Sequence, residues 1–275
     1  MAVHSEGAAM AITHGSGIPI WYEEEGEGPP LVLLHGMMGR SEVWRLEGYV
    51  DGLRDEHRLI LVDARGHGRS ARPSDPADYG LHCQVADVLA VLDEVGLSSA
   101  ALCGWSMGAA TALRTAACAP ERVDAVAAVG APLEWVGFPD VPAPTEDEED
   151  EDGWASRFEH EGMSWVAADL EREGRPAWAR LVARADPLAM AACDRGWGRL
   201  EAAHRRLGDL TVPLLFAWGG LELREGDASR VPAGARLIVL PDEDHVGAFR
   251  RADLLLPALR SFLAAVPRAT SPLVG

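Results

Sequence analysis

The five residues 104–108, which read Gly-Trp-Ser-Met-Gly, constrain the fold of this chain more than any other stretch. They follow the apolar run 100–103 and precede the helix-like, alanine-rich run 109–119. Between a strand and a helix, the pattern G-x-S-x-G is typical of a nucleophile elbow, a turn so sharp that only glycine fits on either side. Ser106 would then be held in a strained conformation at a helix N-terminus. The same pattern also occurs in ordinary turns, so the rest of the chain must support this interpretation.

The order of the apolar and helical runs predicts the fold class. Two β-rich runs, 9–13 and 18–24, flank a predicted hairpin turn. Helical spacing is seen at residues 81–95 and about 247–265, and Ser41 is expected to cap a helix that ends near residue 53. Alternation of strands and helices predicts a mostly parallel sheet that helices cover on both faces. Apolar runs typical of buried parallel strands are found at residues 31–34, 57–62, 100–103, 123–129, 212–218 and 236–240.

The alternation stops after Gly130. Residues 132–206 contain no strand-like run, so the chain divides into segments 1–131, 132–206 and 207–275. The middle segment is rich in tryptophan, which either lines a pocket for an apolar or aromatic substrate or fills the core of a small helical unit. Its five tryptophans, out of nine in the chain, are Trp135, Trp154, Trp165, Trp178 and Trp197.

Four landmarks, in this order, resemble the α/β-hydrolase family. They are His35-Gly36 after one strand-like run, residues 63–70 after the next, the motif 104–108, and His245 after the last. The resemblance covers residues 29–263. It implies an α/β fold with a mostly parallel eight-stranded sheet flanked by helices and a small helical cap, residues 132–206, inserted after the sixth strand. It also implies that residues 63–70 form a structural turn without a catalytic role.

A serine hydroxyl needs a base to remove its proton, and the resemblance identifies His245 as that base. The other histidines have structural explanations; His35 and His67, which lie in tight turn motifs, are expected to hold loops together. The acids that precede His245, residues 242–244, are expected to be surface charges. Ser106 and His245 are therefore the predicted nucleophile and base.

The third member of the triad must be an acid that orients the imidazole and stabilises its charged form. The resemblance places it three residues after the glycine that closes the seventh strand. That position is Glu222 here, where the family usually has Asp. Asp227 in the same loop and Glu134 after the sixth strand remain alternatives.

The oxyanion of a tetrahedral intermediate needs backbone amides placed where the charge develops. One predicted donor is the amide of Met107, the residue after the nucleophile. The second is expected from Met37, in the loop that follows His35-Gly36. The two methionine side chains would line the floor of the pocket or serve only in packing.

The net charge of −18 argues against a nucleic-acid partner, because phosphates would be repelled. No apolar stretch is long enough for a membrane span, no secretory signal is visible, and the four cysteines show no metal-like pairing. We therefore expect a cytoplasmic protein without metal or cofactor, and the oligomeric state is left open. The acidic run 146–152 is expected to be solvated and mobile, and it lacks the spaced glycine of a calcium loop.

A serine at the elbow disfavours epoxide hydrolases and haloalkane dehalogenases, which attack through a carboxylate. We therefore expect a cofactor-independent serine hydrolase that cleaves a carboxylic ester or lactone of a small molecule through an acyl-enzyme. The resemblance is closest to small bacterial esterases and enol-lactonases. The alternatives are a carbon–carbon bond hydrolase, a cofactor-free peroxidase on the same scaffold, and a non-catalytic protein that binds a ligand in the pocket.

Overall fold

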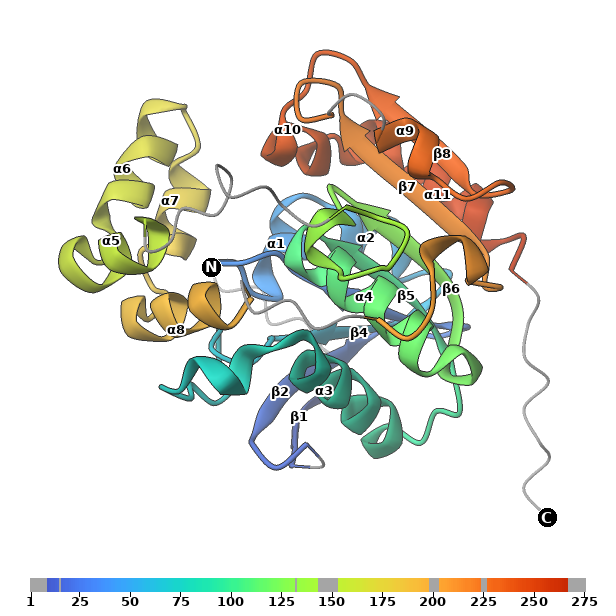
Figure 1. Ribbon diagram of the computed structural model, residues 1–275, viewed down its shortest axis with the longest axis horizontal. Helices are drawn as coiled ribbons and strands as arrows, with labels where there is room; N and C mark the ends of the chain where they lie inside the picture. The colour runs from blue at the N-terminus through green and yellow to red at the C-terminus, as the bar shows by residue number, and fades with distance from the viewer. Residues whose placement is uncertain are drawn as a thin grey trace.

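The computed structural model describes residues 9–14, 16–131, 133–142, 153–197, 203–223 and 227–266. In this part of the chain eight strands form one sheet in the order β1-β2-β4-β3-β5-β6-β7-β8 (Figure 1). Strand β2 runs antiparallel to both its neighbours, and the other pairs are parallel. The predicted α/β class and strand number are confirmed. The strands are β1 Ala9–Thr13, β2 Ile20–Glu25, β3 Pro30–Leu34, β4 Arg58–Val62, β5 Ala100–Trp105, β6 Val123–Val129, β7 Leu214–Gly219 and β8 Arg236–Leu240.

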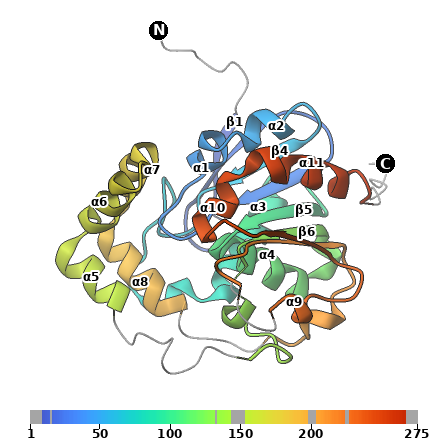
Figure 2. The same cartoon turned by 90° about the horizontal axis from the view of Figure 1, so that it is seen from above.

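Helices cover both faces of the sheet (Figure 2). Helices α1 (Glu42–Leu46), α2 (Tyr49–Leu53) and α11 (Ala252–Leu263) share one apolar core with alternate residues of the central strands, such as Leu31 and Leu33 of β3. Helices α3 (Leu81–Glu94) and α4 (Met107–Cys118) share the other core with the intervening residues Val32 and Leu34. A strand buried on both faces must be apolar throughout, which is why these strands read as continuous apolar runs.

Two helices that the sequence predicts as continuous are broken. The helix expected from residue 41 to residue 53 is divided into α1 and α2 at Gly48, whose φ is 82°. Ser41 makes no side-chain cap there, and its backbone amide donates instead to Asp63 Oδ1 at 2.7 Å. The last predicted helix is also two helices, α10 (His245–Arg250) and α11, because the backbone leaves the helical conformation at Arg251.

Among the described residues between β6 and β7, four α-helices gather at one side of the sheet (Figure 1). They form the cap that was predicted after the sixth strand. The cap helices are α5 Gly153–Glu161, α6 Ser164–Arg172, α7 Pro176–Val182 and α8 Pro187–Trp197. Helix α5 packs against α8 and α6 against α7, while α8 also contacts the short 3₁₀ turn η1 (Pro76–Tyr79) of the core. The remaining short elements are η2 Pro120–Arg122, η3 Leu133–Trp135, η4 Leu207–Asp209 and α9 Asp227–Arg230.

The limits 132 and 206 for the cap segment stay a prediction, and the acidic run 146–152 lies outside the described residues. Within the described ranges, none of the helices combines the length and the apolar character that crossing a membrane requires.

Candidate active site

Ser106 occupies the sharp turn between β5 and α4. Its φ of 55° and ψ of −119° are strained for a residue with a side chain, at a cost of about 1–3 kcal/mol. The turn is tight enough that a Cβ atom at Gly104 would lie 2.2 Å from the carbonyl oxygen of Gly108, and one at Gly108 would lie 2.0 Å from that of Leu34. The two glycines of the motif are therefore required by space. The amide of Ser106 donates to the carbonyl of Val129 at 2.9 Å, which ties the turn to β6.

His245, the first residue of α10, contacts the predicted acid. Its Nδ1 lies 2.5 Å from Oε2 of Glu222, and the other carboxylate oxygen accepts the amide of Gly219 at 2.9 Å. A proton on Nδ1 leaves Nε2 as the acceptor nitrogen, the form that a general base requires. Of the two alternative acids, Asp227 begins α9 and its side chain lies outside the described part of the chain, while Glu134 lies in η3.

A pair of glycines allows the loop that carries Glu222 to approach the loop that carries His245. The amide of Gly220 donates to the carbonyl of Leu240 at 2.7 Å, and a Cβ atom at Gly219 would lie only 2.2 Å from the carbonyl oxygen of Glu243. Side chains at positions 219 and 220 would therefore separate the two loops. The Gly-Gly pair at the end of an apolar strand is the sequence signal of this close approach.

Two of the acids at residues 242–244, which were expected to be surface charges, also hold the helix that begins at His245. Asp244 accepts the amide of Gly247 at 2.5 Å and so caps the helix that begins at His245. Glu243 forms an ion pair with Arg251, which ends the same helix, at 2.8 Å. Both acids therefore stabilise α10 and the position of the imidazole.

The elbow and the imidazole meet at the end of β6. A Cβ atom at Gly130 would lie 3.0 Å from both Nδ1 and Cε1 of His245, and the preceding residue, Val129, accepts the Ser106 amide. The rings of Trp105 and His245 have centroids 5.7 Å apart. The carboxyl ends of neighbouring parallel strands thus bring Ser106, His245 and Glu222 to the same edge of the sheet.

The loop after β3 forms a tight turn that carries Met37. Gly39 donates its amide to the carbonyl of Gly36 at 3.0 Å, and Met38 has a φ of 63°, which together define a type II turn with Met37 at its second position. Among the described residues, the amides of Met37 and of Met107, the first residue of α4, donate to no protein group. The amides of the two predicted oxyanion donors therefore have no protein acceptor in this part of the chain, and their role stays a proposal.

His35 and His67 hold this turn in place, as the sequence predicts. Nδ1 of His35 bonds the carbonyl of Gly36 at 2.8 Å, and its Nε2 accepts the amide of Ala64 at 3.0 Å. Nδ1 of His67 bonds the carbonyl of Arg65, while its Nε2 accepts the Met38 amide at 3.2 Å. Burial lowers the pKa of His35 and brings the pKa of His67 to about 3. Both imidazoles are neutral near pH 7 and serve as structural links.

Residues 63–70 form the structural turn that was expected. The carboxylate of Asp63 accepts the amides of Ser41 at 2.7 Å and Arg69 at 2.9 Å, and Ser70 Oγ donates to the Asp63 carbonyl at 2.5 Å. A Cβ atom at Gly68 would overlap the Asp63 carboxylate, at 1.9 Å from Oδ2. The turn therefore connects β4 to the start of α1.

A family model described as the α/β-hydrolase fold matches residues 29–191, more than half of the chain. The chain belongs to the α/β-hydrolase fold family. An epoxide hydrolase of Caballeronia sordidicola is 33% identical over 119 residues, which are 43% of this chain and 36% of the relative. An acetyltransferase component of the acetoin cleaving system of Cupriavidus necator is 28% identical over 90% of this chain and 67% of its own length.

Solved structures of α/β-hydrolases agree in fold. The enol-lactonase of Burkholderia xenovorans superposes with a TM-score of 0.76 and 23% identity, over 92% of this chain and all of the enol-lactonase. At this identity the likeness establishes the fold only. The chain spans between 27% and 42% of the length of the first curated relatives that it matches. The specific reaction must therefore be argued from the site.

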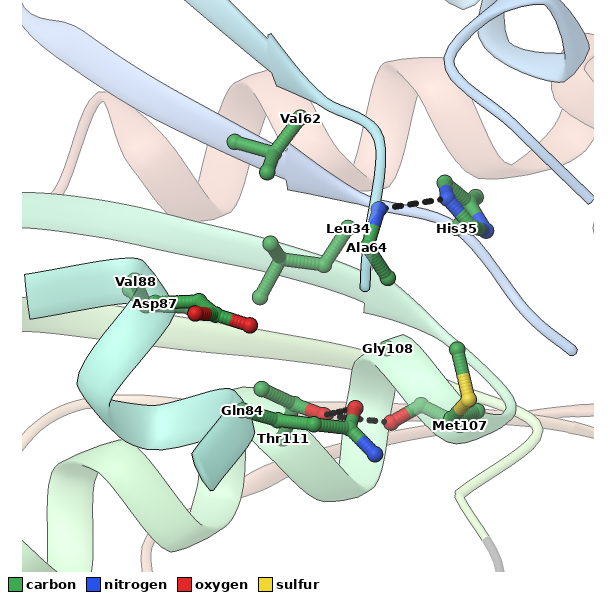
Figure 3. A pocket seen from close by; sticks show the side chains of 10 residues that line it. All are labelled: Leu34, His35, Val62, Ala64, Gln84, Asp87, Val88, Met107, Gly108 and Thr111. Carbon is green, nitrogen blue, oxygen red and sulfur yellow. Dashed lines mark hydrogen bonds between the residues drawn. The ribbon is translucent and has the colours of Figure 1, made fainter. Parts of the chain in front are cut away.

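A small cavity lies beside His35 and the first turn of α4 (Figure 3). Gln84 and Asp87 of α3, Met107 and Thr111 of α4, and His35 contribute to its wall. It offers about 20 Å³ to the centres of water molecules, room for one or two waters and too little for a substrate. Thr111 Oγ1 bonds both Gln84 Oε1 at 2.8 Å and the Met107 carbonyl at 2.9 Å, so the polar groups of this cavity support the first turn of α4.

The cap tryptophans whose side chains are described make different contacts. Trp154 and Trp165 pack against each other within the cap, with ring centroids 5.2 Å apart. Trp178 instead reaches the core: its ring lies edge-on to Trp105 at 5.3 Å, and its Nε1 donates to Glu47 Oε1 at 2.5 Å. Trp178 therefore lies beside the elbow, and Trp197 of α8 packs against the buried cluster that includes Met107. The side chain of Trp135 lies outside the described part of the chain.

Proposed function

We propose that the chain is a cofactor-independent serine hydrolase that cleaves a carboxylic ester or lactone through an acyl-enzyme. The observation that carries this proposal is the 2.5 Å contact between His245 Nδ1 and Glu222 Oε2, beside a serine whose φ of 55° exposes it at the head of a helix. A base that an acid holds in one orientation is what a weak serine nucleophile needs.

In this mechanism His245 Nε2 accepts the hydroxyl proton of Ser106 as Oγ attacks the ester carbonyl. The carbonyl oxygen gains the negative charge, and the amides of Met37 and Met107 donate hydrogen bonds to it. The C–O bond of the ester then breaks, and the leaving alkoxide takes the proton from His245. Water attacks the acyl-enzyme by the same steps in reverse, with His245 again as the base, and releases the carboxylic acid.

Glu222 is the third member of the proposed triad. Its carboxylate is fixed at both oxygens, by His245 Nδ1 and by the amide of Gly219. A negative charge at this point stabilises the imidazolium that forms during the reaction. Asp227 and Glu134 remain the alternatives that mutation must test.

The nucleophile separates this proposal from the reaction of the epoxide hydrolase relative. Epoxide hydrolases attack through a carboxylate at the elbow, whereas the residue at that position here is Ser106. Carbon–carbon bond hydrolysis, cofactor-free peroxidation and simple ligand binding remain alternatives that a measured ester turnover would distinguish.

The test uses short p-nitrophenyl esters and a fluorophosphonate probe. The wild-type protein should hydrolyse the esters and be labelled at Ser106, and Ser106→Ala should lose the label and lower kcat by about 10³-fold or more. Cys118→Ser, a change at an exposed residue at the far end of α4, is the control and should leave both readouts unchanged. A wild-type protein that neither labels nor hydrolyses any of these esters would refute the proposed reaction.

A further inference from the structure

Two buried polar side chains connect the first turn of α4 to the neighbouring helix α3. Thr111 Oγ1 lies 2.8 Å from Gln84 Oε1 of α3 and 2.9 Å from the carbonyl oxygen of Met107, so its one hydrogen is shared between two acceptors. Gln84 Nε2 donates to the carbonyl of Tyr79 at 3.3 Å, which turns the amide oxygen towards Thr111. Both side chains are 4% exposed. A buried hydrogen-bond chain therefore leads from η1 through α3 to the residue that follows the nucleophile.

These hydrogen bonds cross the small cavity of Figure 3. Gln84, Asp87 and Val88 of α3 line it together with Met107 and Thr111 of α4. Close packing normally fixes one helix against another, and atoms that border a void lack such contacts on one side. Across this gap, the distance between the two helices is therefore set by the contact of Thr111 with Gln84.

Helix α3 is itself held in place. Nε and Nη2 of Arg65 donate to the two carboxylate oxygens of Asp87, both at 2.7 Å, and both side chains are 5% exposed. Arg65 also donates to the carbonyls of Asp78 and Cys83, so one guanidinium joins the turn after β4 to η1 and to the start of α3. Bidentate, charge-assisted contacts of this kind are among the stronger hydrogen bonds in proteins. Gln84 therefore extends from a firmly anchored helix.

The first turn of α4 needs such support. The first four amides of a helix have no acceptor within it, so this turn is the part that the helix fixes least by itself. The carbonyl and the amide of Met107 flank one Cα atom, and a shift of the carbonyl must move the amide. The Met107 side chain is held from another direction, in a buried cluster with Tyr79 and with Cys193 of the cap, whose Sγ lies 3.9 Å from the Met107 sulfur.

We infer that Thr111 and Gln84 are positioning residues of the oxyanion hole, which hold the Met107 amide at the place where the oxyanion forms, with Gln84 acting through Thr111. This inference rests on the proposed function and extends it to two residues that do not touch the substrate. The physical reason is that an oxyanion is stabilised only by donors within a few tenths of an ångström of the right distance. A first turn that can move towards the cavity would weaken that hydrogen bond.

The first experiment compares two matched losses of a hydroxyl group in α4. Thr115 Oγ1 donates to the carbonyl of Thr111 at 2.8 Å and is fully buried, so Thr115→Val removes the same kind of bond one turn further from the nucleophile. Thr111→Val should lower kcat on a p-nitrophenyl ester about tenfold with KM changed less than about twofold, because the lost interaction acts in the transition state. Thr115→Val should keep kcat within about twofold while urea unfolding shows a similar loss of stability. Equal values of kcat in these two variants would overturn the inference.

A second comparison tests whether Gln84 acts through Thr111. Gln84→Met should lower kcat about threefold in the wild type and no further in the Thr111→Val protein, since residues on one path are not additive. Thr111→Ser, which keeps the hydroxyl, should recover most of the kcat lost in Thr111→Val. A Gln84→Met loss of the same size in both backgrounds, or a Thr111→Ser protein as slow as Thr111→Val, would refute this path.

The third experiment observes the Met107 amide without any turnover. With ¹⁵N-methionine, the seven methionines give a simple amide spectrum, and the Met107 resonance is the one that Met107→Leu removes. This resonance should shift in Thr111→Val and in Gln84→Met, and stay in place in Thr115→Val. A Met107 resonance that Thr111→Val leaves unmoved would overturn the inference whether or not the protein cleaves esters. The expected shifts in a protein without ester turnover would support the tether and refute the proposed hydrolase, whereas ester turnover that Thr111→Val leaves unchanged would do the reverse.

Discussion

The indole of Trp105 stacks on the ring of Phe249, with centroids 4.6 Å apart and planes inclined by 17°. Trp105 precedes the nucleophile, and Phe249 lies four residues after His245 in α10. Trp178 of the cap lies edge-on to both rings, at 5.3 Å and 6.2 Å. One aromatic cluster therefore connects the elbow, the helix of the proposed base and the cap. A substitution at Phe249 should therefore shift the imidazole of His245 without replacing His245 itself.

Phe249→Leu tests this connection. Phe249 is fully buried, so we expect a loss of about 1–3 kcal/mol in the free energy of unfolding, measured with urea. We also expect kcat to fall about tenfold or more at a temperature where the variant stays folded, because displacement of a reacting group by an ångström is costly. Phe262→Leu, another buried aromatic in α11, is the control and should lose stability with little change in kcat. If the two variants lost kcat equally, the loss would reflect general destabilisation of the fold and not a displaced imidazole.

Glu222→Gln should lower kcat by about 10²–10⁴-fold, because an amide cannot stabilise the imidazolium and can hold the imidazole in the wrong tautomer. The fold should be retained, since the Gly219 amide still has an oxygen acceptor in Gln. Steady-state kinetics on a short p-nitrophenyl ester provide the measurement.

Two further variants complete this comparison. Glu134→Gln and Asp227→Asn should change kcat less than threefold if Glu222 is the acid. If kcat fell strongly in either of these variants while Glu222→Gln stayed active, that other residue would be the acid of the triad. The contact between Glu222 and His245 would then be structural only.

The central strands and the elbow could be predicted because each rests on a local pattern. Central strands such as β3 are buried on both faces and therefore apolar at every position, from Leu31 to Leu34. The elbow is equally local, since the space around Gly104 and Gly108 excludes any side chain. The position of Glu222 followed from the family resemblance, which places the acid three residues after the glycine that closes such a strand.

Other features depend on contacts that no local pattern records. The break at Gly48 resembles an ordinary helical glycine in the sequence, and only its φ of 82° reveals it. Glu42 and Arg184 are distant in the chain and form an ion pair only because the cap packs near α1. The capping role of Asp244 was hidden because the helix boundary was predicted two residues too late.

The free energy of unfolding should depend on pH through the buried imidazole of His67. Its pKa of about 3 in the folded protein lies below the 6.5 expected in the unfolded chain, so below pH 6.5 the unfolded chain binds a proton that the folded protein does not. Stability contributed in this way is present above pH 6.5 and is lost as the pH falls towards 3. His67 alone should account for about 2 kcal/mol between pH 7 and pH 5.

The measurement is urea unfolding at these two pH values for the wild type and for His67→Gln, which retains an acceptor for the Met38 amide. The variant should lose about 2 kcal/mol less than the wild type between pH 7 and pH 5. His160→Gln, at an exposed position in α5, should behave as the wild type. The same loss in all three proteins would show that other groups dominate the acid sensitivity.

Met37→Pro isolates the proposed oxyanion donor from its side chain. Met37 occupies the second position of the type II turn Gly36–Gly39, where proline fits the backbone and is favoured. Proline has no amide hydrogen, so this variant removes the donor while it preserves the turn. We expect kcat to fall about 10²–10³-fold, the cost of losing one oxyanion hydrogen bond, with the free energy of unfolding maintained or slightly raised.

Met37→Leu is the matched control, because it alters the side chain and keeps the amide. It should retain kcat within about threefold, since an apolar replacement of similar volume disturbs packing little. Circular dichroism and urea unfolding should show both variants folded, which attributes the difference in kcat to the missing amide. If the proline variant hydrolysed esters as fast as the leucine variant, the Met37 amide would not bind the oxyanion, and the charge would have to be stabilised by Met107 and a different partner.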